Sequence, residues 1–186
     1  MKILQRMVAA LLLVVLSPFL LLIAVAVKIS SSGPVLFIGQ RLGRDEVPFL
    51  MYKFRTMYEG SEQLGDQTVP NDSRVTPLGR ILRPYHADEW PQLWNVLTGE
   101  MGLVGPRPQV PSYYAEYRNS ARYRQCMSVL PGITGIAQVR GQWWVMKVGR
   151  RRQLAVEAFY ARRKCFWFDI RLIALTTRVI AAGKSI

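Results

Sequence analysis

Histidine and cysteine are scarce in this chain, whose 186 residues include only His86, Cys126 and Cys165 from those two types. A single histidine argues against a metal site built from several imidazoles and against a histidine-based catalytic triad. The two cysteines lack the close spacing of a zinc motif, so we expect reduced thiols in a cytosolic compartment. His86 lies two residues before Asp88, where we expect it to be a bystander.

Acidic residues are also few, at 12 against 25 basic ones, which gives a net charge of +13. This excess predicts a polyanionic partner, which could be nucleic acid, anionic lipid headgroups or phosphorylated substrates. The sequence shows no internal repeat and no low-complexity linker. Its length therefore predicts one modest domain next to an apolar N-terminus.

The apolar N-terminus, Met7 to Val27, has no charged residue and is long enough to cross ~30 Å of hydrocarbon as a helix. A cleaved signal peptide, a single span and a re-entrant hairpin are the three hypotheses. Lys2 and Arg6 precede the run and Lys28 follows it, so the positive-inside tendency draws both ends to the cytoplasm.

Ser17 and Pro18 lie at the midpoint of the run. Proline removes a backbone hydrogen bond and bends a helix, and the Ser17 hydroxyl is a local partner for the freed group. Each half would reach only ~15 Å, roughly one leaflet. We therefore favour a re-entrant membrane hairpin over residues 1–28, with residues 29–186 forming a cytoplasmic domain on the membrane surface.

An acidic pair, Asp88 and Glu89, stands just ahead of an apolar helical run. A helix beginning at Asp88 would make that residue the N-cap and keep Pro91 in the first turn. Adjacent helical residues diverge by ~100°, so one carboxylate could attack or transfer a proton while the other holds a cation. The alternative is a simple cap with a glutamate that complements the helix dipole.

The segment from Gly99 to Pro108 is too rich in glycine and proline to be expected as a packed element. It presents Arg107 between two prolines that fix the backbone around it. A rigid arginine near an acidic pair suits a bidentate phosphate clamp. Together these segments predict chemistry on a phosphorylated, metal-bound substrate.

The rest of the sequence predicts an α-rich α/β domain with a small β-hairpin formed by residues 33–43 and 49–55. Lys53 and Arg55 would share one face of the second strand, either to bind phosphate oxygens or to be solvated. Residues 59–74 are expected to form a surface loop, with a substrate lid as the alternative.

Residues 148–164 are expected to form a helix, and Asp169 to open another over residues 170–182. Basic and aromatic residues alternate around these helices. That pattern is typical of interfacial helices at a membrane surface, or of a stacking platform for single-stranded nucleic acid. The apolar N-terminus favours the anionic phospholipid bilayer over nucleic acid.

Three motifs together resemble the bacterial sugar transferases, the monotopic polyprenyl-phosphate phosphoglycosyl transferases. They are KFRTM at residues 53–57, HADEWPQLWNVLTGEMGLVGPRP at residues 86–108 and PGITGIAQV at residues 131–139. They occur in the family's order and span nearly the whole chain. The resemblance implies the small, catalytic-domain-only type, with a re-entrant membrane helix broken at a Ser-Pro pair.

The resemblance implies transfer of a phosphosugar from a UDP-sugar to polyprenyl (undecaprenyl) phosphate. UMP is released, and the reaction is the first membrane step of glycoconjugate assembly, at the cytoplasmic face of the inner membrane. Asp88 matches the nucleophile that forms a covalent aspartyl-phosphosugar, and Glu89 matches the ligand of Mg²⁺, or of Mn²⁺. The phosphate- and substrate-binding candidates are Lys53, Arg55, Arg83, Arg107, Gln138 and Arg140.

Two residues depart from the family pattern. Trp90 replaces a usual Leu, and Glu157 replaces a usual Asp ahead of Phe159 and Tyr160, which makes a role for Glu157 doubtful. Two other classes of protein stay open: a magnesium-dependent lipid-pyrophosphate phosphohydrolase and a non-catalytic basic membrane adaptor.

Overall fold

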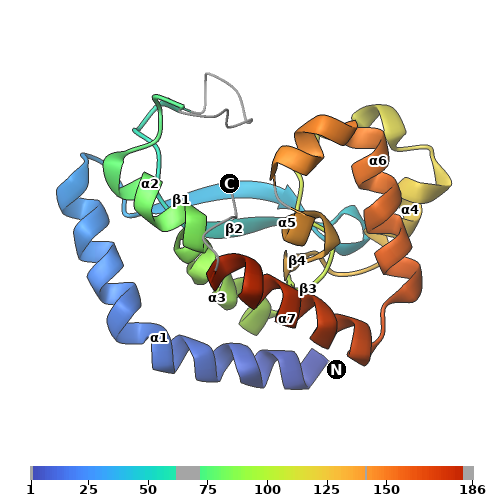
Figure 1. Cartoon of the computed structure of the whole chain (residues 1–186), viewed down its shortest axis with the longest axis horizontal. Coiled ribbons are helices and arrows are strands. Elements are labelled where there is room, and N and C mark those ends of the chain that lie inside the picture. The colour runs from blue at the N-terminus through green and yellow to red at the C-terminus, as the bar shows by residue number, and fades with distance from the viewer. Residues whose placement is uncertain (1, 62–71, 141, 182–186) are drawn as a thin grey trace.

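The computed structural model describes residues 2–61, 72–140 and 142–181. A long bent helix runs along the bottom and left of the molecule, and the small sheets and shorter helices lie inside its angle (Figure 1). In chain order, with η for a 3₁₀ helix, the elements are α1 (Lys2–Ser30), β1 (Leu36–Leu42), η1 (Arg44–Glu46), β2 (Pro48–Phe54), α2 (Pro77–Leu82), η3 (Arg83–Tyr85), η4 (Ala87–Gln92), α3 (Leu93–Thr98), β3 (Gly102–Val104), η5 (Ala115–Tyr117), α4 (Ala121–Met127), β4 (Gly132–Thr134), α5 (Ile136–Arg140), α6 (Gln142–Arg163) and α7 (Phe166–Ala181). The chain is therefore mostly helical, with little sheet.

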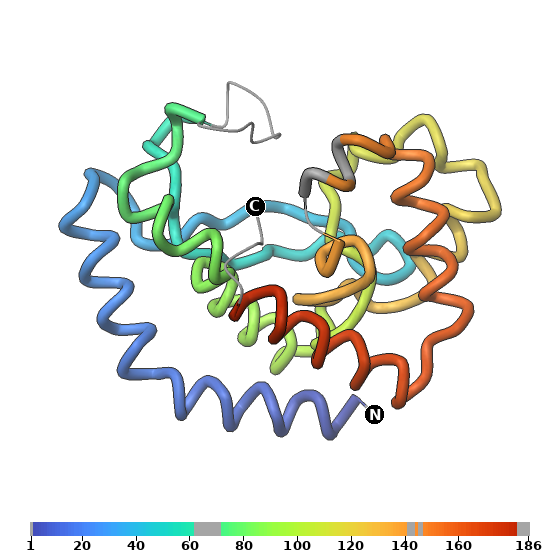
Figure 2. Tube along the Cα trace, in the orientation of Figure 1, coloured from blue at the N-terminus to red at the C-terminus, as the bar shows by residue number. Residues whose placement is uncertain are grey.

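Helix α1 contains Pro18 in its interior and bends along its length (Figures 1 and 2). Ser17 Oγ donates a hydrogen bond to the Val14 carbonyl oxygen at 2.7 Å. Val14 stands four residues before Pro18, so its carbonyl is the one that the missing proline N–H cannot reach. The partner predicted for the freed backbone group is confirmed. The hairpin topology in a bilayer stays a prediction.

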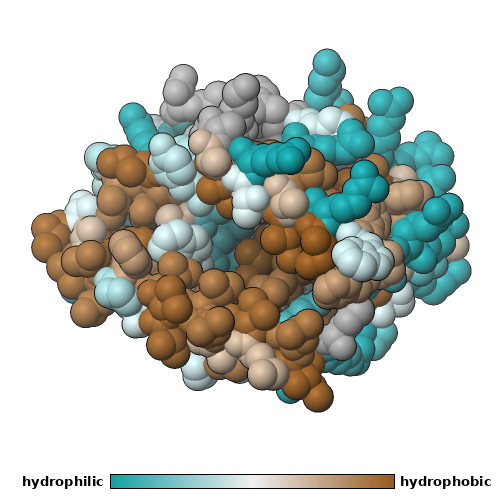
Figure 3. Space-filling view, turned by 60° about the horizontal axis from the view of Figure 1, so that its bottom comes forward, coloured by the Kyte–Doolittle hydropathy of each residue, from teal (hydrophilic) through white to brown (hydrophobic). Residues whose placement is uncertain are grey.

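Among the described residues, α1 is the one helix long and apolar enough to cross a membrane, and only 6% of its most apolar stretch is buried. Large apolar side chains such as Leu11, Val14 and Phe19 are more than half exposed. Hydrophobic residues gather along α1 in Figure 3, whereas hydrophilic residues gather over the upper and right-hand rim. An exposed apolar surface of this kind indicates association with a membrane.

The inner side of α1 packs into two separate hydrophobic clusters. The first half places Ala9 against Phe49 of β2 and Val96 of α3. The second half places Val27 against Phe54 at the end of β2 and Leu82 of α2. The helix thus forms part of the core of the domain.

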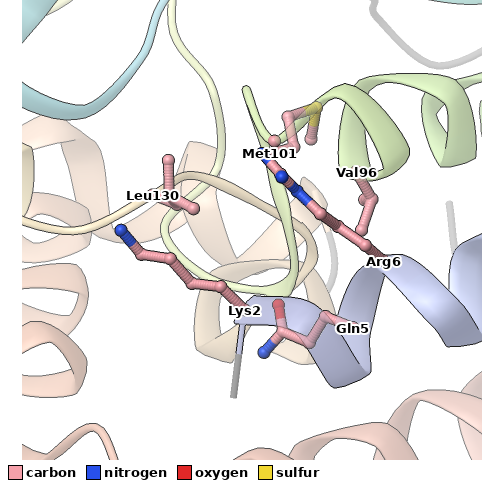
Figure 4. A pocket seen from close by; sticks show the side chains of 7 residues that line it. Lys2, Gln5, Arg6, Val96, Met101 and Leu130 are labelled. Atoms are coloured by element: carbon pink, nitrogen blue, oxygen red, sulfur yellow. The ribbon is translucent and has the colours of Figure 1, made fainter.

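Polar contacts fix the beginning of α1 to the turn after α3. Arg6 Nη2 donates to the Thr98 carbonyl oxygen at 3.0 Å, and Gln5 Oε1 accepts from the Leu103 amide at 3.3 Å. Gly99 has a left-handed φ of 91° and lies directly beneath the Arg6 guanidinium, where a Cβ would clash. Figure 4 shows Arg6 extending from α1 toward Met101 and Lys2 extending toward Leu130. The hollow that these residues line is about 20 Å³, far too small for a nucleotide.

The predicted hairpin is confirmed, since β1 and β2 pair antiparallel with Leu36 opposite Phe54 and Leu42 opposite Pro48. Asn95 of α3 holds β2 from the side: its Oδ1 accepts from the Tyr52 amide at 3.2 Å and its Nδ2 donates to the Leu50 carbonyl at 2.7 Å. Asn95 is completely buried. This connection places β2 beside the segment that leads into α3.

The expectation that residues 99–108 form no packed element was wrong. β3 pairs in parallel with β4, with Gly102 opposite Gly132 and Val104 opposite Thr134. The backbones approach so closely that a Cβ on Gly132 would lie 2.0 Å from the Gly105 amide nitrogen. The glycines are therefore what allows the segment to pack, whereas we had taken them as evidence against packing.

The two C-terminal helices differ from their predicted bounds. α6 begins at Gln142, but Gly149 has a non-helical backbone (φ 74°, ψ 166°), so the helix is interrupted close to the predicted start at residue 148. α7 begins at Phe166, and Asp169 lies buried in its first turn, where it accepts a 2.7 Å hydrogen bond from the Tyr160 hydroxyl. Asp169 thus joins α7 to α6 and does not open the helix.

Candidate active site

The acidic pair lies on a 3₁₀ helix, so the prediction of a helix capped by Asp88 was wrong. His86 takes a left-handed conformation (φ 51°) that turns the chain between η3 and η4, and α3 begins only at Leu93. This turn buries the side chains of Asp88 and Glu89. Adjacent residues of a 3₁₀ helix diverge by about 120°, so the two carboxylates still have different surroundings.

Glu89 is surrounded by basic side chains. Its Oε1 lies 2.5 Å from Lys53 Nζ and 3.8 Å from Arg107 Nη1, and its Oε2 lies 3.5 Å from His86 Nδ1. Burial alone would raise the pKa of Glu89, but Lys53, His86 and Arg107 outweigh it and hold the pKa well below its ordinary value. Glu89 is therefore the more acidic carboxyl of the pair.

Asp88 is the more basic of the two carboxylates. Burial, and then the neighbouring charge of Glu89, raise its pKa, while Lys53, Arg83 and His86 act in the opposite direction. Arg83 is held in place by a 2.9 Å hydrogen bond from its Nε to Thr56 Oγ1. A buried carboxylate of raised basicity beside cations has the properties of a nucleophile toward phosphorus.

His86 lies next to the acidic pair, and its expected role as a bystander stays a prediction. Its ring nitrogen faces Glu89 three residues along the chain. The left-handed backbone at His86 produces this approach, and nothing in the sequence signals it.

Glu157, whose role the sequence left doubtful, contacts the backbone of Arg107. Its Oε2 accepts a 2.8 Å hydrogen bond from the backbone N–H of Arg107, and its side chain is almost fully buried on α6. The two residues are fifty positions apart. One signal for Glu157 was present in the sequence. It stands ahead of Phe159 and Tyr160, where the family that the sequence resembles usually has an aspartate.

Three predicted substrate-binding residues have other contacts. The Arg55 guanidinium donates to the carbonyls of Ser31 and Ser32 after α1, the first at 2.7 Å, and so connects α1 to β2. Gln138 Nε2 donates to the Gly132 carbonyl at 3.4 Å, and the Arg140 guanidinium lies 5.1 Å from the centre of the Trp144 ring. Their substrate roles stay predictions. Of the suspected lid at 59–74, residues 62–71 lie outside the described part of the chain.

The donor atoms at the pair fit a magnesium ion held mainly by substrate. Within the described ranges no cluster of three or more His, Cys, Asp or Glu side chains is present. Mg²⁺ is commonly bound by one or two carboxylates together with phosphate oxygens and waters. The ionised Glu89 suits that arrangement, and a metal there stays a prediction.

Comparison with known proteins identifies similar chains. The family model described as bacterial sugar transferase matches residues 1–183. The UDP-glucose:undecaprenyl-phosphate glucose-1-phosphate transferase of Klebsiella pneumoniae is 41% identical over 175 residues, covering 91% of this chain and 37% of the relative. The UDP-N-acetylgalactosamine-undecaprenyl-phosphate N-acetylgalactosaminephosphotransferase of Aeromonas hydrophila is 37% identical, covering 90% of this chain and 40% of the relative.

The chain thus spans about two fifths of the length of these two relatives. An uncharacterized sugar transferase of Bacillus subtilis, EpsL, is 33% identical and matches 100% of this chain and 90% of its own length.

Proposed function

The chain belongs to the bacterial sugar transferase family, and on that premise we propose that it transfers a phosphosugar from a UDP-sugar to undecaprenyl phosphate. The observation that carries the proposal is the buried pair Asp88 and Glu89 among the basic side chains Lys53, Arg83 and Arg107. Carboxylates attacking a diphosphate are repelled by its charge, and the surrounding cations offset that repulsion. The names of two relatives give UDP-glucose and UDP-N-acetylgalactosamine as donors to test first.

In the first step, an Asp88 carboxylate oxygen attacks the phosphorus that carries the sugar. The bond between this phosphorus and the bridging oxygen breaks, and UMP leaves with that oxygen and its electron pair. The product is an aspartyl-phosphosugar. Lys53 and Arg107 lie close to Glu89, and the charge of Arg83 acts to lower the pKa of Asp88. Basic side chains are therefore available near both carboxylates to bind the phosphate oxygens.

In the second step, a phosphate oxygen of the lipid attacks the same phosphorus and the Asp88 carboxylate leaves unchanged. The lipid then carries a diphosphate joined to the sugar. Separating the transfer into two displacements allows the soluble donor to leave before the lipid acceptor binds.

Magnesium belongs to this proposal as the ion that Glu89 would help to hold, and when bound it would withdraw negative charge from phosphate oxygens of the donor. Glu89 suits this role because its low pKa keeps it ionised. The residues of the chain perform the remaining tasks of attack, charge neutralisation and orientation.

The membrane is the expected location because one substrate is a lipid. Besides α1, the corner between α6 and α7 exposes Phe166 and Trp167, and Arg163 lies 5.6 Å from the centre of the Phe159 ring. Aromatic and basic side chains placed together in this way favour the boundary between headgroups and hydrocarbon. We propose that both ends of α1 lie on the cytoplasmic face.

The test is a reaction of the detergent-solubilised protein with each UDP-sugar in the absence of lipid. We expect UMP in an amount comparable to the enzyme, and an adduct on Asp88 that is visible by intact mass and removed by hydroxylamine. Asp88→Asn should lose the adduct and the overall transfer, because an amide of nearly the same shape is a poor nucleophile. Glu116→Gln, an exposed carboxylate on η5, is the matched control.

Transfer without any adduct, occurring only when donor and lipid are both present, would establish direct displacement. Release of free phosphosugar without an acceptor would instead favour a phosphohydrolase. Adduct formation by the Asp88→Asn protein would place the nucleophile at another residue.

A further inference from the structure

We infer that Glu157 is a positioning residue, which fixes the backbone of Arg107 so that its guanidinium meets the diphosphate of the donor. The inference rests on the proposed function, which supplies the diphosphate. Glu157 does not touch the reacting atoms, and its effect passes through Arg107.

The backbone on both sides of Arg107 offers few other attachments. Pro106 and Pro108 have no N–H, so the Arg107 amide is the only backbone donor in this tripeptide. It donates to Glu157 at 2.8 Å, while the Pro106 carbonyl accepts from the Gly132 amide at 2.9 Å. The peptide unit joining Pro106 to Arg107 is therefore held at both its N–H and its carbonyl group.

Glu157 is itself fixed by a buried chain of hydrogen bonds. Its Oε1 accepts from Gln153 Nε2 at 3.2 Å, and Gln153 Oε1 accepts from the Tyr113 hydroxyl at 2.8 Å. Gln153 is completely buried and Glu157 is 2% exposed. Both carboxylate oxygens of Glu157 are thus occupied by N–H donors in a site that admits little water.

A carboxylate is the group that this arrangement needs. Two donors from different elements reach separate oxygens of Glu157, and a carboxylate offers each of them an acceptor. Leucine at this position would leave the Arg107 amide without an acceptor, and the loop would lose its attachment to α6. Aspartate would keep both acceptors on a shorter arm.

The guanidinium end of Arg107 is in the right place to act on a ligand. Arg107 Nη1 lies 3.8 Å from Glu89 Oε1, and the side chain is 40% exposed, so it reaches the acidic pair while staying accessible to a diphosphate. Displacing such a group by about 1 Å is enough to lower a rate roughly a hundredfold. A mobile Arg107 backbone would also have to be ordered when the diphosphate binds, so binding would weaken even though the arginine is still present.

A double-mutant cycle on binding of uridine diphosphate tests the inference without requiring any chemistry. Titration calorimetry compares wild type, Glu157→Leu, Arg107→Met and the double variant. We expect each single variant to weaken binding about tenfold or more, and the double variant to bind no more weakly than Arg107→Met alone. Glu157→Asp should recover most of the affinity.

The control for stability is Leu154→Ala on the same helix. Leu154 is buried in a different contact, against Tyr114 and Tyr123, so this change should lower Tm and leave the affinity for uridine diphosphate unchanged. If Glu157→Leu does not fold, Glu157→Gln replaces it in the cycle, because glutamine places an NH2 group where one of the two donors now has an acceptor oxygen.

Additive losses in the double variant, or unchanged affinity in Glu157→Leu, would overturn the inference, as would a wild type that does not bind uridine diphosphate. A different result would show that the proposed function is wrong: the wild-type protein would bind uridine diphosphate, but it would neither release UMP from a UDP-sugar nor form the adduct.

Discussion

The buried carboxyl of Glu157 should make the stability of this protein fall as the pH rises. Burial raises its pKa from the ordinary 4.5 to about 7, and the hydrogen bonds from Gln153 and Arg107 only partly oppose this. Between these two values the folded protein holds a proton that the unfolded chain has released. The stabilisation is therefore fully present below pH 4.5 and is lost as the pH rises through about 7.

The size of the effect follows from the difference between the two pKa values. At about 1.4 kcal/mol for each tenfold change in proton affinity, the loss is about 3 kcal/mol, most of it between pH 5 and pH 8. For a chain of this size, 1 kcal/mol shifts Tm by roughly 2–4 °C. Glu157→Gln removes the titration, so the Tm of the variant minus that of wild type should grow by about 5–10 °C between pH 5 and pH 8.

Thermal unfolding of both proteins in the same detergent measures this difference. All other titrating groups are common to the two proteins and cancel in the comparison, and the altered hydrogen bonding of glutamine adds an offset that does not depend on pH. Curves that run parallel from pH 5 to pH 8 would mean that Glu157 titrates like a solvated carboxyl, and the reasoning from its burial would be refuted.

Three further predictions concern the metal, the membrane helix α1 and the contact of Arg55 that joins α1 to β2. EDTA should abolish transfer, and Glu89→Gln should lower it by orders of magnitude with membrane association unchanged; full activity in that variant would assign the metal to another ligand. A cysteine at position 2 should be labelled only from the cytoplasmic side, and labelling of this cysteine from the periplasm in the protein that keeps Pro18 would rule out the hairpin. Pro18→Ala should shift the helix toward a straight span, because it restores the backbone donor to the Val14 carbonyl. Arg55→Met should cost about 2 kcal/mol of stability by leaving the carbonyls after α1 unpaired, and an unchanged Tm would show that this contact contributes nothing.

Local patterns in the sequence predicted the elements that depend on local interactions. The apolar run with Pro18 predicted a bent helix and the Ser17 hydrogen bond, and the strand pattern around the glycine turn predicted the β1–β2 hairpin. The motif containing Asp88 and Glu89 located the acidic pair. In each of these cases the decisive residues lie within a few positions of one another.

The features that sequence reasoning missed depend on contacts between distant segments. β3 and β4 are three residues each and pair across about thirty positions, so neither shows a strand pattern of its own. The left-handed His86 is a non-glycine residue in a conformation with little sequence signal, yet it decides that Asp88 is buried in a 3₁₀ turn. The hydrogen bond from Arg107 to Glu157 joins residues whose relation exists only in the folded chain.

The packing of α1 into two clusters of the core makes the acidic pair and the exposed apolar side of α1 parts of one rigid unit. Ala9 belongs to the same hydrophobic cluster as Val96 of α3, and Val27 to the same cluster as Ala87, the residue before Asp88. If α1 lies in a bilayer as we propose, this packing would hold the carboxylates at one fixed depth, whereas a flexible tether would let them move toward and away from the surface. On the proposed function, a lipid phosphate held at headgroup level by its own chain would then meet the enzyme at a constant height, and only lateral diffusion would be left to bring them together.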